Sequence, residues 1–131
     1  MTARRIAGCV AVAMLFAAHV PVRAHHSFAA EFDADKPFKV TGPVTKVEWT
    51  NPHVWFYVDV KEAGGSANWA MEMGSPNGLL RTGWTRNSIR IGDVVTVEGF
   101  RARDRNNIGN ASVVILASTG QTLFAGSSAP R

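Results

Sequence analysis

The sequence predicts a mainly β protein, and two observations carry that prediction. Short segments rich in Val, Thr and aromatic residues alternate between apolar and polar positions, which is the period of a half-buried strand. Turn-forming Gly, Pro, Asn and Asp residues separate these segments at short intervals, as expected of consecutive strands. A chain of 131 residues, 46% of them hydrophobic, has room for one globular core.

The first 24 residues have the pattern of a cleavable signal peptide. Arg4 and Arg5 form a basic start, residues 6–18 are apolar, and Val22-Arg23-Ala24 places small residues where a signal peptidase reads them. The apolar run is shorter than the about 20 residues that span a bilayer. We therefore predict a signal peptide at 1–24, a periplasmic or secreted location, and no membrane span after cleavage.

Removal of the leader changes the charge of the chain. Arg4, Arg5 and Arg23 leave with it, so the 14 Lys and Arg residues become 11, against 10 Asp and Glu. The exported protein is then nearly neutral, which argues against nucleic acid or an anionic membrane as its partner. Cys9, the single cysteine, also leaves, so neither a disulfide nor thiol chemistry is expected.

The domain is expected at residues 38–124, after an N-terminal arm at 25–37. Residues 38–49 predict a long first strand with a bulge or bend at Gly42-Pro43. A turn at 50–52 leads into the second strand, at 53–61, whose two faces differ in character. Its faces consist of Val54, Phe56, Val58 and Val60 on one side and His53, Trp55, Tyr57 and Asp59 on the other.

A hairpin loop at 62–68 precedes a short third strand at 69–73. In that strand Trp69, Met71 and Met73 share one face, and Glu72 faces away from them. A short helix follows, and Ser75 is its expected cap, Pro76 its first residue and Gly83 its stop.

Strands at 94–101 and 111–117 come next, with a polar loop at 102–110 between them. Gly120 then begins a short extension that ends near Phe124, before a flexible tail at 125–131. This order predicts a five-stranded OB-fold-like barrel with one short helix between strands 3 and 4. An open meander and a small sandwich are the alternatives, but a barrel removes the exposed edges of a small flat sheet.

Cleavage after Ala24 makes His25 the N-terminal residue, followed by His26. A free amine, with a pKa near about 8, readily yields its proton to a metal, and the imidazole of the same residue closes a chelate with it. A further imidazole completes a T-shaped set of three nitrogens that suits Cu(II). This terminus resembles the histidine brace of copper monooxygenases and periplasmic copper carriers. We therefore predict a copper site with His25, His26 and His53 as ligands.

Histidines at an exposed terminus do not require a functional copper site. They also bind Cu(II) or Ni(II) adventitiously, under the general order of affinities. Met71 and Met73 are soft ligands for Cu(I), but their alternate positions on a strand are more typical of a core.

A second hypothesis needs no metal. Trp55 and Tyr57 belong to a polar and aromatic stripe on a strand that OB-folds use for ligands, although such aromatics are also typical of packing. Arg101 and Arg103 enter the loop that borders the same binding face, where a solvated, salt-bridged loop is the simpler interpretation. These four residues would hold a periplasmic protein partner or a small ligand.

The motifs of common enzymes do not occur in this sequence. It contains no paired acid and base, nucleophile elbow, glycine-rich phosphate loop or metalloprotease helix. We therefore expect a soluble binding or accessory protein, not an enzyme.

Four segments of the exported chain resemble one family. They are HHSFAAEFD, VTGPVTKVEWTNPHVWFYVDV, WAMEMGSPNGLLRTGW and GDVVTVEGFRARD. Together they are similar to a family of small exported bacterial proteins of unknown function, over nearly the whole exported chain. The resemblance implies export and a single domain, and it assigns no catalytic residue.

Overall fold

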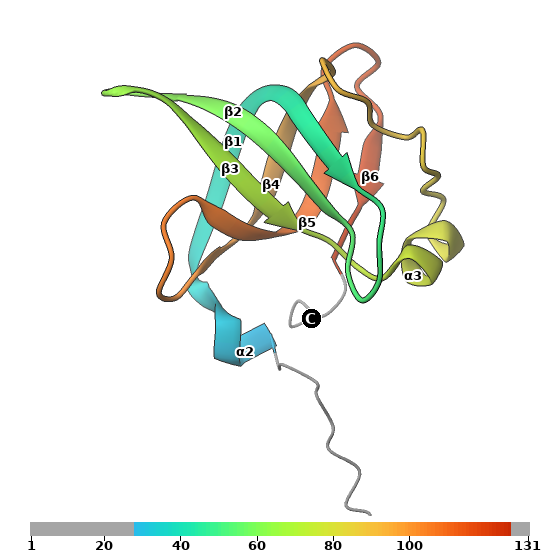
Figure 1. Ribbon diagram of the computed structural model, residues 1–131, viewed down its shortest axis with the longest axis horizontal. Helices are drawn as coiled ribbons and strands as arrows, with labels where there is room; N and C mark the ends of the chain where they lie inside the picture. Colours follow the sequence, from blue (N-terminus) through green and yellow to red (C-terminus); the bar gives the residue numbers. More distant parts are fainter. Residues whose placement is uncertain (1–27, 127–131) are drawn as a thin grey trace, which may run out of the picture.

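The computed structural model describes residues 28–126 (Figure 1). The predicted signal peptide at 1–24, His25 and His26 lie outside the described residues, as do residues 127–131 of the predicted tail. The described part is mainly β, as predicted. Its elements are α2 (Phe28–Glu31), β1 (Phe32–Glu48), β2 (Trp55–Glu62), β3 (Gly65–Glu72), α3 (Pro76–Arg81), β4 (Val94–Ala102), β5 (Ile108–Leu116) and β6 (Thr122–Phe124).

The strands form one sheet in the order β3-β2-β1-β4-β5-β6. A parallel pairing of β3 with β5 joins the sheet to itself, so five strands form a ring of hydrogen bonds, while the other pairings are antiparallel. The long strand β1 serves both halves of this ring. Val44 and residues 46–48 pair with β2, whereas Phe32 and residues 37–43 pair with β4.

The bulge of β1 does not lie at Gly42-Pro43, where we expected it. The register with β2 shifts between Val44 and Lys46, so Thr45 is the extra residue. Gly42 has a different role, because a Cβ at this position would overlap the backbone carbonyl of Asp59. The glycine therefore marks a close approach of two strands, which is the other common meaning of a glycine inside a strand.

The core fills the ring with the apolar faces that the alternation predicted. In β2 the side chains of Phe56, Val58 and Val60 are buried, and in β3 those of Trp69 and Met71. Met73 is also buried, so both methionines belong to the core, as their alternate positions indicated. The other large side chains that are almost fully buried are Trp84, Val44, Val54, Val95, Val97 and Val114.

The helix α3 begins and ends as the sequence predicted. The Ser75 hydroxyl accepts a hydrogen bond from the amide of Gly78, and Pro76 occupies the first turn. The chain then turns at Gly83, whose φ is +95°. Neither helix of the described part is long and apolar enough to cross a membrane.

Several elements begin earlier than the sequence suggested, and α2 and β6 were not expected as regular elements. β1 starts at Phe32, inside the predicted arm, because Phe32 pairs with Ala102 of β4. Residues 33–37 are partly or fully exposed, so no alternation of buried and exposed positions reveals this part of the strand. β3 likewise begins in an exposed segment, at Gly65, where pairing with β2 sustains the strand. β5 begins at Ile108, inside the predicted loop, and its residues 109–111 are buried.

Candidate functional site

His53 and Glu72 form a close pair on the outer side of the ring. Nδ1 of His53 lies 2.6 Å from Oε1 of Glu72. The pair forms because the ladder between β2 and β3 continues past Trp55: the amide of Val54 donates to the carbonyl of Gly74, and the amide of Met73 donates to the carbonyl of Val54. The side chain of His53 is 38% exposed and that of Glu72 only 6%. One ring nitrogen is therefore engaged with a buried carboxyl, while the ring reaches the surface.

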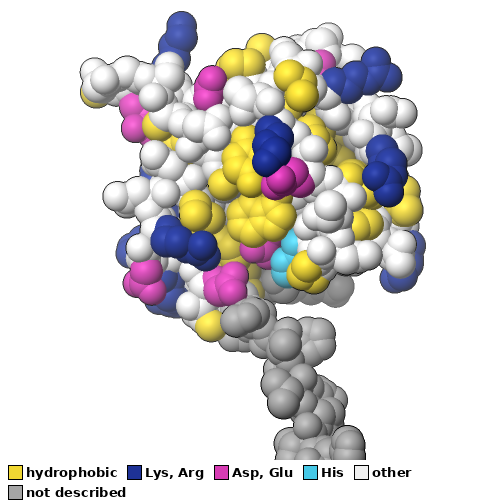
Figure 2. Space-filling model, in the orientation of Figure 1, with side chains coloured by type: hydrophobic (Ala, Val, Ile, Leu, Met, Phe, Trp, Pro, Cys, Tyr) yellow, Lys and Arg dark blue, Asp and Glu magenta, His cyan; other side chains and the backbone are white. Residues whose placement is uncertain are grey.

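The environment of Glu72 raises its pKa above the ordinary value. Burial raises the pKa of this carboxyl, His53 opposes that change by favouring the charged form, and Glu31 raises the pKa further. Because Nδ1 of an imidazole can donate or accept, the contact between Nδ1 and Oε1 exists in either state of the carboxyl. Nε2 of His53 is the ring nitrogen that remains for another partner. Figure 2 shows the histidine side chain next to acidic side chains.

Asn110 extends this pair into a buried polar cluster. It is 0% exposed, and within the described part neither its Nδ2 nor its Oδ1 has a hydrogen-bond partner. Its register neighbours are Glu72 on β3 and Phe100 on β4. Directly opposite residues in a sheet share a face, so Asn110 lies beside Glu72 on the outer side. A buried amide whose two polar atoms both lack a hydrogen-bond partner is unusual in a folded protein.

The short helix α2 is tied to the sheet beside this cluster. The ring of Phe28 packs edge-on against Phe100, with 5.7 Å between the centroids. Nε of Arg103 donates to the carbonyl of Ala29 at 2.9 Å, and the amide of Arg103 donates to the carbonyl of Glu31 at 2.9 Å. In Figure 1, α2 lies at the start of β1, beyond the end of the ring. Arg103, a predicted ligand-binding residue, thus holds the N-terminal segment of the described chain.

Arg101 lies apart from Arg103. Its guanidinium is 4.5 Å from the centroid of the Trp69 ring, a distance at which a cation is attracted to an indole face. β4 ends at Ala102, so the alternation that suggested a common side for the two arginines stops between them. The two arginines thus have different neighbours: Arg101 contacts Trp69, and Arg103 contacts Ala29.

Trp55 and Tyr57 share the outer face of β2, as predicted, but they have different neighbours. Trp55 pairs across the sheet with Glu72, so it borders the His53 pair. The hydroxyl of Tyr57 donates to Glu48 at 2.9 Å, and Lys46 forms an ion pair with the same carboxylate at 2.6 Å. The hydrogen bond to Glu48 raises the pKa of Tyr57. Tyr57 is thus part of a charged cluster that does not include His53.

Of the three predicted metal ligands, His53 lies in the described part, whereas His25 and His26 do not. Within residues 28–126 no group of three or more His, Cys, Asp or Glu side chains could hold a metal ion. The sequence did not mark Glu72 or Asn110 as site residues. Each of the two is a polar residue beside apolar neighbours in its strand. Only the pairing of β3 with β5 shows that they lie next to each other.

The comparisons with known proteins agree with the resemblance noted in the sequence. The comparison with curated proteins gives no match. A family model described as "Family of unknown function (DUF6152)" matches residues 12–111, which is most of the chain. This protein therefore belongs to the DUF6152 family.

Proposed function

We propose that the exported protein is a copper-binding accessory protein. Its site would consist of the amine and imidazole of His25, His26 beside them, and Nε2 of His53. The observation that carries this proposal is the contact between Nδ1 of His53 and the buried Glu72. A histidine that binds a metal commonly gives its other ring nitrogen to a carboxylate, which fixes the orientation of the ring and raises its basicity. When Glu72 is ionised, Nδ1 of His53 donates to it, and the lone pair of Nε2 would be available to a metal.

The position of α2 supports a joint site. Phe28 is held against Phe100, and α2 is held by Arg103. Glu31 of α2 lies near enough to Glu72 to raise its pKa. A joint site requires His25 and His26, which precede Phe28 by three and two residues, to reach the end of the sheet where His53 lies.

The donor set favours copper over zinc. The amine and imidazole of His25 and Nε2 of His53 would supply three nitrogen ligands and His26 a further one, a set that matches the tetragonal preference of Cu(II). A structural zinc site would need four ligands, commonly including cysteine, and the single cysteine of this chain is Cys9. The protein would hold the copper ion tightly, for storage or for transfer to a periplasmic partner. We assign no catalytic turnover to this site.

The scaffold that we propose for this site is an OB-type barrel. Two features support it: the cyclic pairing β1-β2-β3-β5-β4, with β3 and β5 parallel, and the position of α3 between β3 and β4. In OB-folds ligands bind across the face of strands 2 and 3 and the adjoining loops. His53, Trp55 and Glu72 belong to this region.

Two measurements on protein purified from the bacterial envelope test the proposal. Mass spectrometry first establishes whether the chain begins at His25. Electron paramagnetic resonance during a Cu(II) titration then compares the wild type with His25→Ala and His53→Ala. We expect one tight site whose nitrogen couplings change in both variants. Asn68→Ala, which removes a polar side chain bound to Asp59 and Thr45 elsewhere on the sheet, is the control and should leave the spectrum unchanged.

Two results would overturn the copper proposal. A different N-terminal residue would remove the chelate of amine and imidazole. If the spectrum and the copper affinity were unchanged in His53→Ala, exposed histidines would bind copper without this scaffold. The metal-free hypothesis, a partner or small ligand on the face of Trp55 and Tyr57, would then take its place.

A further inference from the structure

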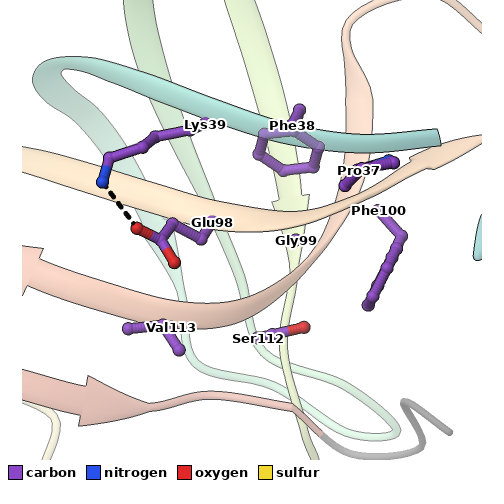
Figure 3. Close-up of a pocket in the computed structure, with 8 residues that line it drawn as sticks. All are labelled: Pro37, Phe38, Lys39, Glu98, Gly99, Phe100, Ser112 and Val113. Carbon is purple, nitrogen blue, oxygen red and sulfur yellow. Dashed lines mark ion pairs between the residues drawn. The ribbon is translucent and has the colours of Figure 1, made fainter.

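A groove with a volume of about 680 Å³ lies over β1, β4 and β5 (Figure 3). Apolar side chains of Pro37, Phe100 and Val113 line it. Small-molecule sites commonly measure about 300–1,000 Å³ and are mostly apolar, with a few polar groups that fix the ligand. The groove therefore has the size and the character of a binding site for a small molecule. It contains none of the residues of the proposed copper site.

Ser112 is an uncharged polar residue that lines the groove. Glu98 pairs with Val113 and Gly99 with Ala111, so Ser112 is the extra residue of a bulge in β5. Bulges commonly redirect a side chain near functional sites. The Oγ atom of Ser112 is buried, and within the described residues it has no hydrogen-bond partner. An unpaired buried hydroxyl is unfavourable by itself, and a ligand atom that pairs with it removes that penalty.

The charges at the groove neutralise each other. Nζ of Lys39 lies 2.8 Å from Oε1 of Glu98, and the side chain of Lys39 is largely exposed and that of Glu98 partly exposed. Figure 3 shows this ion pair on the side of the groove opposite Phe100. A charged ligand would have to break the pair or lose its hydration against apolar walls, and both are unfavourable. The lining therefore selects an uncharged ligand.

We propose that this groove binds a small, uncharged aromatic molecule that carries one hydroxyl or carbonyl group. Its ring system lies against Pro37, Phe100 and Val113, and its polar atom forms a hydrogen bond with Oγ of Ser112. Because Ser112 can donate or accept, a ligand hydroxyl and a ligand carbonyl both fit. This site does not depend on the copper proposal.

The test uses 2-naphthol as the probe and naphthalene-2-sulfonate as its charged counterpart, with the whole exported chain free of metal. Titrations followed by amide resonances should show saturable binding of 2-naphthol at one site, with the largest shifts at Gly99, Ser112 and Val113. The sulfonate should bind at least tenfold more weakly. Equal binding of the two probes, or shifts confined to other strands, would overturn the proposal.

Two variants locate the site. Ser112→Ala removes the hydroxyl and should lower the affinity for 2-naphthol by about three- to tenfold, as expected for the loss of one hydrogen bond. Val113→Lys places a charged chain in the groove and should abolish saturable binding while the amide spectrum stays dispersed. Ser66→Ala, at an exposed position of β3, is the matched control and should bind like the wild type. Unchanged affinity in both groove variants would also overturn the proposal.

Discussion

Gly99 of β4 lies against the backbone carbonyl of Asn110 on β5 so closely that a Cβ at Gly99 would overlap the carbonyl oxygen. The register between these strands shifts at the same place, beside Ser112. Both partners are backbone atoms, so neither can rotate away from an added methyl group. This close approach fixes the segment of β5 that carries the buried amide of Asn110 and the hydroxyl of Ser112.

Gly99→Ala should therefore destabilise the domain more than a substitution of one methyl group normally does. Overpacking of a rigid site lowers the free energy of unfolding by about 1–3 kcal/mol, and we expect the upper end of that range. Urea denaturation measures the change. Gly64→Ala is the matched control, because a Cβ at Gly64 would meet nothing within 4 Å, and it should stay within about 0.5 kcal/mol of the wild type. Equal stabilities of the two variants would contradict the contact.

Tyr57 is the single tyrosine of the chain, so its ionisation can be followed by the ultraviolet absorbance of tyrosinate. The hydrogen bond that its hydroxyl donates to Glu48 raises the pKa of Tyr57, and burial adds to the rise. Glu48→Gln removes the charge and should lower the pKa of Tyr57 towards its ordinary value. Glu98→Gln changes the same type of residue in another ion pair and should leave the titration unchanged.

The same hydrogen bond has a pH dependence whose sign follows from the raised pKa. A group with a pKa above its unfolded value contributes stability that is fully present below the unfolded value and is lost as the pH rises through the folded value. The stability difference between wild type and Glu48→Gln should therefore be constant near neutral pH and shrink in the alkaline range where Tyr57 ionises. A difference that instead grew with alkaline pH would contradict the assigned cause.

The sequence predicted the elements that rest on alternation and on helix caps. The apolar face of β2 and the cap at Ser75 are local patterns, and the structure has both. It did not predict α2, or the strand residues that begin at Phe32, because their contacts are with Arg103 and β4, far along the chain. In these segments the structure depends on contacts with residues far along the chain, and not on a local sequence pattern.

The candidate site follows the same rule. His53 could be found from the sequence, because histidine is a common metal ligand and the chain contains four histidines. Glu72 and Asn110 could not, since their proximity depends on the parallel pairing of β3 with β5. The two histidines of the predicted N-terminus lie outside the described residues, so their role stays a prediction.

Arg103→Ala should loosen α2 without unfolding the domain. The substitution removes the hydrogen bond from Nε to the carbonyl of Ala29 and the contact with Asp33, and the Arg103 side chain is 45% exposed. We expect a loss of about 1 kcal/mol or less in the free energy of unfolding. Hydrogen exchange at residues 28–31 should become several-fold faster. Arg81→Ala, on the exposed side of α3, is the control and should leave exchange in α2 unchanged.

Glu72→Gln tests whether the buried carboxyl serves the proposed copper site or the fold alone. Loss of a carboxylate that orients a ligating histidine lowers metal affinity by about 10- to 100-fold, so we expect a loss in this range from Cu(II) titrations. Because Glu72 would act through His53, the double variant with His53→Ala should bind no more weakly than His53→Ala alone. If the losses of copper affinity in the two single variants added up in the double variant, or if Glu72→Gln left the affinity unchanged, the carboxyl would have a purely structural role. Thermal unfolding of the metal-free variants separates the two cases, since a positioning role requires lost affinity in a protein that remains folded.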